Sequence, residues 1–295
     1  MEMGASSTKA NRPNTVSTKL NIYHRLHYQY DAPVLLGPQR LNLQPRLALH
    51  QRLLDYQLDI SPLPTGLYTE LDAEGNPSQW AYFNGPADQL EVVLNMTVDC
   101  QPFDPYHFLI YPFEAARLPF AYSRLLEQLL SMYKEQAPPE PAVADWAAAL
   151  LSEAGGETVP FLMLLCQRLR EEFSYLLREE GPPHDPAYTF HSRRGSCRDL
   201  STLMIAACRS VGLAARFVSG YAWMEEEDVK NELHAWVEVY LPGAGWRGFD
   251  PTQGSAVTDR HLAMAASAYP ERTAPVSGGY GGTAASRLET EVALG

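Results

Sequence analysis

Residues 195–252 constrain the fold of this chain more than any other stretch, because a helix pattern is followed there by strand patterns. Ser196 and Asp199 stand three residues apart, as in the capping box at the start of a helix. Apolar residues then recur at helical spacing, at Leu200, Leu203, Met204, Ala207 and Val211. Gly212 follows, a residue suited to the end of a helix. The sequence therefore predicts an amphipathic helix that begins at Cys197.

Three strand patterns follow this helix. Residues 215–221 read as a strand, and residues 233–241 alternate between two faces. One face of the second pattern carries His234, Trp236, Glu238 and Tyr240. A Pro-Gly-Ala-Gly turn at residues 242–245 joins it to a return strand at residues 246–250. A helix followed by an antiparallel hairpin predicts an α+β fold.

The rest of the chain divides near residue 102. Residues 1–18 form a polar leader that we expect to be disordered. Residues 19–102 alternate at period two between turn signals, which predicts an N-terminal antiparallel β domain, built as a sandwich. Residues 103–295 form a second domain, with a helical part (103–212) and a β part (213–295). Its further patterns are helices at residues 113–134, 142–154 and 159–177 and a last strand over residues 288–294.

Composition narrows the function classes. The 295 residues include 23 Lys and Arg against 35 Asp and Glu, a net charge of −12. Such an acidic chain lacks the clustered basic residues that bind nucleic acid or an anionic membrane surface. Its apolar runs fall far short of the roughly 20 residues of a membrane helix, and residues 1–18 lack the apolar core of a secretory signal. We therefore expect a cytoplasmic protein with no nucleic-acid or membrane partner.

Cys197 is the cysteine with a functional setting. At the first position of a helix, unpaired backbone amides and the positive end of the helix dipole favour a thiolate. Arg193, Arg194 and Arg198 add positive charge nearby. The other cysteines are interpreted as small buried hydrophobic residues: Cys100, Cys166 and Cys208. The spacing of the cysteines offers no CxxC pair, so we expect no disulfide, metal or cofactor.

Cys197, His234 and Asp250 have the residue types of a nucleophile, a base and a group that orients the base. The hairpin register decides whether they meet. In a symmetric turn, Leu241 would pair with Trp246. Asp250 would then point away from His234, because direct partners share a face. A triad therefore requires a one-residue bulge or an asymmetric turn between Leu241 and Asp250, and we predict that irregularity.

Three motifs resemble the core of the transglutaminase-like superfamily: GSCRD at residues 195–199, HAWVEV at 234–239, and GW with FDPT within 245–252. Two further segments, residues 28–34 and 38–45, are similar to the N-terminal β region of its bacterial members. The resemblance implies a papain-like thiol enzyme with a triad of Cys197, His234 and Asp250. It also implies that the catalytic sheet continues through Asp259, Arg260 and His261.

This resemblance implies a cysteine-dependent amide-bond hydrolase, a peptidase or amidase that acts on a peptide or protein through a thioester acyl-enzyme. The alternatives are transglutaminase-type acyl transfer to an amine and a non-catalytic peptide-binding scaffold. The motifs are shared by these outcomes and do not choose between them. The N-terminal β domain is a candidate docking module for a partner protein or a lid on the substrate groove.

Several residues around the triad have two readings. The tryptophans Trp223, Trp236 and Trp246 either line a substrate groove or belong to the core. The acidic residues 225–228 either form a solvated loop or attract basic peptides. The backbone N–H of Cys197 is a natural oxyanion donor, and the candidates for a second donor are Tyr188, Ser192 and Gln253. His24 and His27 are interpreted as ordinary residues of the β domain.

Overall fold

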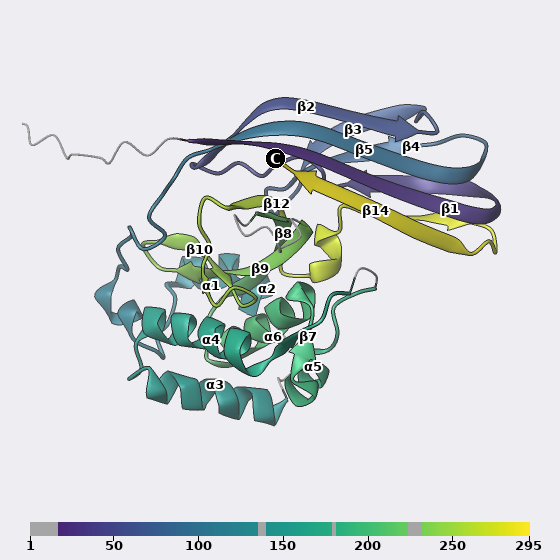
Figure 1. The fold of residues 1–295 in the computed structure, drawn as a ribbon. Coiled ribbons are helices and arrows are strands. Elements are labelled where there is room, and N and C mark those ends of the chain that lie inside the picture. The colour runs from purple at the N-terminus through teal and green to yellow at the C-terminus, as the bar shows by residue number, and fades with distance from the viewer. Residues whose placement is uncertain (1–16, 135–139, 179–180, 224–231) are drawn as a thin grey trace, which may run out of the picture.

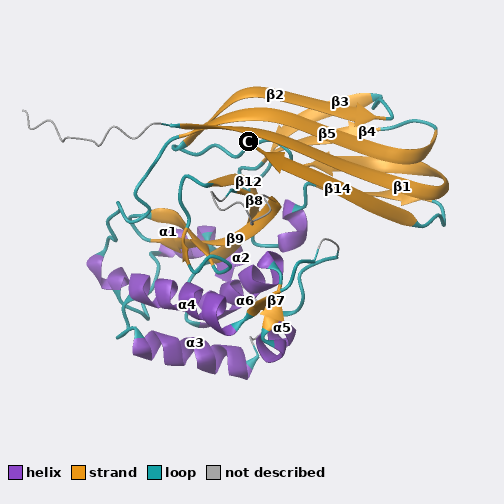
Figure 2. Ribbon diagram, viewed as in Figure 1, coloured by secondary structure: helices purple, strands orange, loops and turns teal. Residues whose placement is uncertain are grey.

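The computed structural model describes residues 17–134, 140–178, 181–223 and 232–295. Nearly all of the predicted leader, and the whole acidic segment 225–228, lie outside the described residues. A large antiparallel sheet, a smaller central sheet and a group of helices are stacked in that order (Figures 1 and 2). None of the described helices has the length and apolar character that a membrane crossing needs.

The large sheet is organised around one long strand, β1 (Thr18–Leu41). Its order is β2-β5-β1-β4-β3, and two strands from the C-terminal end of the chain also pair with β1. The other strands are β2 (Gln51–Ser61), β3 (Gly66–Leu71), β4 (Pro77–Tyr82), β5 (Pro86–Cys100), β13 (Val276–Gly281) and β14 (Ser286–Leu294). The predicted α+β fold with an N-terminal antiparallel β region is confirmed. All seven strands belong to one hydrogen-bonded sheet, curled as a half-barrel, and not to the two packed sheets of the predicted sandwich. They form one sheet because β1 changes partners along its length.

The last two strands of the chain belong to the large sheet and not to the predicted second domain. Residues 276–294 were assigned to the β part of the second domain, but β13 and β14 return to β1 (Figure 1). In this pairing His24 lies opposite Val292 and Tyr28 opposite Leu288. The alternation at residues 288–294 predicted a strand correctly, yet it carries no information about which strand is its partner.

The central sheet has the order β11-β10-β9-β8-β12. Its strands are β8 (Ala215–Ala222), β9 (Glu232–Leu241), β10 (Gly245–Asp250), β11 (Ser255–Ala256) and β12 (His261–Ser267). The predicted continuation of this sheet is confirmed at His261 by the pairing of β12 with β8, while Asp259 and Arg260 lie in the turn before β12. One core joins Val237 and Val239 of β9 to the helices, and a second core joins Tyr221 and Leu262 to the large sheet.

The helices partly follow the predicted ranges. They are η1 (Phe113–Ala116), α1 (Arg124–Leu129), α2 (Ser131–Lys134), α3 (Pro141–Glu153), α4 (Thr158–Glu172), α5 (Pro186–Ser192) and α6 (Cys197–Ser210). The prediction of one helix over 113–134 is wrong, because Pro119 lacks an N–H and restricts the residue before it. The helix predicted over 159–177 ends at Glu172. Beyond it, β6 (Ser174–Tyr175) pairs with β7 (Arg194–Gly195), just ahead of α6.

Hydrogen bonds join the large sheet to β12, the edge strand of the central sheet. The turn between β3 and β4 brings the Asn76 amide to β12, where it donates to the Ala266 carbonyl over 2.9 Å and accepts from the Ala266 N–H over 2.8 Å. Glu74 in the same turn accepts from the Ser267 hydroxyl and the Ala268 N–H. These side chains replace the missing neighbour strand, so the β12 edge is satisfied without another chain.

Candidate active site

Cys197 is the first residue of α6, as predicted, and its helix start is strongly capped. The backbone N–H and the hydroxyl of Ser196 both donate to Asp199 Oδ2 over 2.8 Å. The other oxygen, Oδ1, accepts from Arg178 and from the His184 N–H, each over 2.7 Å. Burial raises the pKa of Asp199, but these donors outweigh it and hold the pKa below its usual value. The Asp199 carboxylate therefore fixes both the helix start and the positions of Arg178 and His184.

Two of the three predicted arginines, Arg193 and Arg198, have different surroundings. Arg193 pairs with Glu172 at 3.1 Å and lies over the Phe173 ring, so its charge is engaged away from the helix start. Arg198 donates to the carbonyls of Gly181 and Arg178. Burial lowers the pKa of Arg198, while the nearby charge of Cys197 acts in the opposite direction. The charge of Arg198 therefore interacts with Cys197, as the sequence predicted for this arginine.

His234 lies near the start of β9, between the cysteine and an aspartate. Its Nε2 is 2.8 Å from Asp250 Oδ2, and Cys197 also acts on the pKa of the ring. Burial lowers the pKa of His234, but the charge and hydrogen bond of Asp250, followed by Cys197, raise it well above its usual value. The arrangement therefore favours an imidazolium at His234 beside the Asp250 carboxylate.

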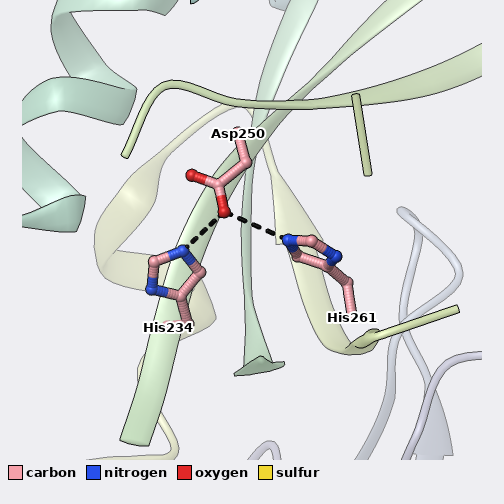
Figure 3. A group of neighbouring side chains, drawn as sticks. All are labelled: His234, Asp250 and His261. Carbon is pink, nitrogen blue, oxygen red and sulfur yellow. Dashed lines mark hydrogen bonds and ion pairs between the residues drawn. The ribbon is translucent and has the colours of Figure 1, made fainter. Parts of the chain in front are cut away.

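Asp250 is fully buried at the end of β10. Its Oδ1 accepts the backbone N–H groups of Thr252 at 2.8 Å and Gln253 at 3.3 Å. Its Oδ2 accepts from His234 and from a second histidine, His261, at 3.1 Å (Figure 3). Burial raises the pKa of Asp250, yet the two histidines outweigh it and lower the pKa far below the usual value. The carboxylate is therefore ionised and held by four donors.

The hairpin turn brings Asp250 to the face of His234. Leu241 pairs with Gly245, one residue earlier than in a symmetric turn, and the ladder then continues regularly to the Phe249–Val237 pair. The next pair would match Asp250 with Trp236, which shares a face with His234. The predicted asymmetric turn is confirmed. Gly243 and Gly245, with φ of 79° and 77°, supply the left-handed conformations that this turn needs.

His261 is the site neighbour that sequence reasoning missed. The resemblance implied only that this residue continues the sheet, and its distance from His234 along the chain gave no reason to join the two. The available signal was a second histidine eleven residues after Asp250, in a segment expected to run beside the catalytic strands. That signal does not reveal side-chain contact, because β12 lies beyond β8 in the sheet order.

The two histidines and the aspartate are also a possible set of metal ligands. Their ligand atoms lie within 4.8 Å of one another. However, both Nε2 atoms lie at hydrogen-bond distance from the same Asp250 oxygen. Nitrogens that donate protons to a carboxylate do not direct lone pairs at a shared ion. The hydrogen-bonding pattern fits an organised imidazole–carboxylate cluster better than a metal site.

Of the three tryptophans, Trp236 lies beside the candidate triad. Its buried ring is stacked near His234, with centroids 6.3 Å apart. Trp246 packs instead against Tyr133 and under Arg216, and Trp223 packs with the core of the large sheet. The structure does not bring the three together as one groove.

The three candidates for a second oxyanion donor also lie in different surroundings. The Gln253 N–H is directed to Asp250 Oδ1, while the Ser192 hydroxyl donates to backbone carbonyls within its own segment. Tyr188 lies exposed on α5, where its ring contacts His184. The assignment of a second donor stays a prediction.

Matches to family models agree with this fold and site. Residues 145–251 match the transglutaminase-like superfamily, and residues 20–99 match the bacterial transglutaminase-like N-terminal region. The chain therefore has a transglutaminase-like core and a bacterial transglutaminase-like N-terminal region.

Individual relatives extend the match over most of the chain. The uncharacterized protein Rv2569c of Mycobacterium tuberculosis is 29% identical over 268 residues, which cover 85% of this chain and 84% of that protein. A protein-glutamine gamma-glutamyltransferase of Pseudomonas aeruginosa is 32% identical over 112 residues, covering 35% of this chain and 17% of the relative. A crystal structure from Cytophaga hutchinsonii, named a "Putative Cysteine Protease", covers 95% of this chain and 91% of its own at a TM-score of 0.69 and 20% identity. This last similarity supports the fold alone.

Proposed function

We propose that this protein is a cysteine-dependent hydrolase of amide bonds in peptides or proteins. The observation that carries the proposal is the 2.8 Å hydrogen bond between His234 and Asp250, with Cys197 acting on the same imidazole. A nucleophile, a base and an orienting carboxylate in this order have the geometry of a catalytic triad.

The first half of the proposed reaction forms a thioester. The Cys197 thiolate attacks the carbonyl carbon of the amide, and the negative charge that develops on oxygen is stabilised by the Cys197 backbone N–H at the start of α6. The His234 imidazolium then donates its proton to the leaving amine as the C–N bond breaks. Asp250 stabilises the imidazolium and holds its ring in place.

The second half returns the enzyme to its starting state. Neutral His234 takes a proton from water, which attacks the thioester carbonyl. The carboxylic acid leaves as the C–S bond breaks, and the thiolate–imidazolium pair forms again. Acyl transfer is the second candidate, in which an amine replaces water. The similarity to the protein-glutamine gamma-glutamyltransferase favours keeping it, although the match is to a minor part of that protein.

The test is mass spectrometry of a mixed peptide pool incubated with the protein and a simple primary amine. Cys197→Ala is the matched control. We expect shortened peptides that are absent from the control. Amine adducts or cross-links would replace hydrolysis with acyl transfer. Identical spectra for the two proteins would favour the binding scaffold, which needs no reactive thiol.

A cytoplasmic location is part of the same proposal, because the acidic composition and the unpaired cysteines suit a reducing compartment. The N-terminal sheet is proposed as a docking module for a partner protein. Fractionation of cells that express a tagged chain tests the location.

A further inference from the structure

His261 places a second imidazole against the candidate triad. It opens β12, and its Nε2 lies 3.1 Å from Asp250 Oδ2. That oxygen lies between the rings of His234 and His261 (Figure 3). The His261 side chain is almost fully buried. A polar ring in such a place must be held by specific hydrogen bonds.

The second ring nitrogen determines where the His261 proton lies. The backbone N–H of Thr258 donates to Nδ1 over 3.3 Å, and an N–H group has no lone pair with which to accept. Nδ1 must therefore present its lone pair, which leaves the proton of the neutral ring on Nε2. The Nε2–H group of His261 then donates to Asp250 Oδ2.

Packing fixes the orientation of this ring. Trp236 meets it edge to face, with centroids 5.3 Å apart, and the His261 N–H closes a turn onto the Thr258 carbonyl over 3.1 Å. The packing of Trp236 and Leu262 requires glycine at position 220. A Cβ there would come within 2.8 Å of Trp236 and 2.0 Å of the Leu262 carbonyl oxygen. His261 is therefore a rigid donor.

We propose that His261 is a positioning residue for the candidate triad, whose Nε2–H holds Asp250 Oδ2 against His234. With Oδ2 held there, the His234 proton stays on Nε2 and the other ring nitrogen is left for Cys197. Asp250 accepts from two backbone N–H groups and two histidine side chains. His234 belongs to the candidate triad, so His261 is the side-chain donor from outside it. This inference rests on the roles proposed above for the triad residues.

The test compares His261→Leu with His261→Gln. Leu fills a similar volume and removes the donor, whereas Gln returns an amide N–H close to the position of Nε2. The readout is the pH dependence of Cys197 alkylation by iodoacetamide, located by peptide mapping, with Cys197→Ala as the blank. It needs no substrate. Thermal unfolding checks that each variant is folded.

The titratable groups around the reacting pair come from several elements. Cys197 of α6, Asp250 of β10 and His261 of β12 surround His234. His50, whose pKa is lowered by burial, lies near Asp259 and Glu238, whose charges act against that lowering. Neither variant changes these groups, so they do not affect the comparison of Leu with Gln.

We expect the alkylation midpoint of His261→Leu to move about one pH unit upward. At a fixed pH below both midpoints, this shift means about a tenfold loss of Cys197 thiolate. The Gln variant is expected to stay at the wild-type midpoint. Once a substrate is in hand, kcat should fall about 10- to 100-fold in the Leu variant at unchanged KM, as for other partners that orient a working histidine.

An unchanged or lowered midpoint in a folded His261→Leu variant overturns the positioning role, and so does an equal shift in Leu and Gln. If the Leu variant does not fold, His261→Asn replaces it, because its shorter amide falls short of Asp250 and must give the upward shift. A wild-type protein without amide-bond turnover would overturn the proposed hydrolase but leave this test in force, since alkylation depends on no substrate.

Discussion

Two buried histidines, one in each region of the molecule, respond to burial in opposite ways. In the N-terminal sheet, His24 Nδ1 lies 2.8 Å from the Tyr221 hydroxyl, and burial lowers the pKa of His24 to about 4. In the central sheet, His234 is also buried, but Asp250 and Cys197 raise its pKa well above the usual value. Burial penalises the charged ring in both places, and only the ionic partners of His234 outweigh that penalty. Burial thus favours a neutral histidine in the N-terminal sheet, whereas the partners of His234 favour a protonated one in the central sheet.

The largest effect should come from the nucleophile of the core. Cys197→Ala is expected to lower kcat by about 10⁴- to 10⁶-fold, because the attacking atom is lost. The free energy of unfolding should change by less than about 1 kcal/mol, since a first helix position accepts Ala. Steady-state kinetics and urea unfolding measure the two. Full activity would move the chemistry away from the core.

Asp250→Asn tests what makes His234 different from His24. The amide keeps the shape but removes the charge, so burial is left to lower the pKa of His234, as it does for His24. We expect kcat to fall by about 10³- to 10⁴-fold. The alkylation midpoint of Cys197 should also move to higher pH. A variant with wild-type kinetics would remove Asp250 from the mechanism.

His24→Gln tests the neutral histidine. Because the folded pKa of His24 lies near 4 and the unfolded pKa near 6.5, the unfolded chain binds more protons between these values. Stability should therefore fall as the pH drops from 6.5 toward 4, by about 3 kcal/mol from this group. Gln keeps a partner for Tyr221 and should flatten that slope in urea unfolding measured against pH. Equal slopes in both proteins would contradict the assignment.

Asn76→Ala tests how separate the two regions are. The change leaves the buried Ala266 N–H and carbonyl without their side-chain partner, which should cost about 1–3 kcal/mol in the free energy of unfolding. We expect kcat to stay within about twofold, because Asn76 contacts the β12 edge and not the triad. A large loss of kcat in a folded variant would mean that the N-terminal sheet also shapes the site.

The difference between the regions also explains what the sequence could predict. The start of α6 was predicted to the residue, because the Ser196–Asp199 capping box acts within one turn of chain. The faces of β9 followed from its alternation. The asymmetry of the turn after β9 was predicted only as a condition for the triad, since its geometry depends on a distant segment: the Tyr111 N–H donates to the Pro242 carbonyl over 3.0 Å. A Cβ at Gly243 would lie 2.6 Å from the Tyr111 nitrogen, so this contact also requires glycine there.

The sequence by itself determined the α+β class, the helix that begins at Cys197 and the faces of the hairpin, because these follow from backbone periods and caps that act over a few residues. Only the tertiary structure decided that β13 and β14 return to β1, that Asp250 turns toward His234, and that His261 reaches the same carboxylate. Those choices depend on which distant segments bury the most apolar surface while satisfying every polar group. The alternation of residues within one strand shows its two faces but does not identify the strands that pair with it.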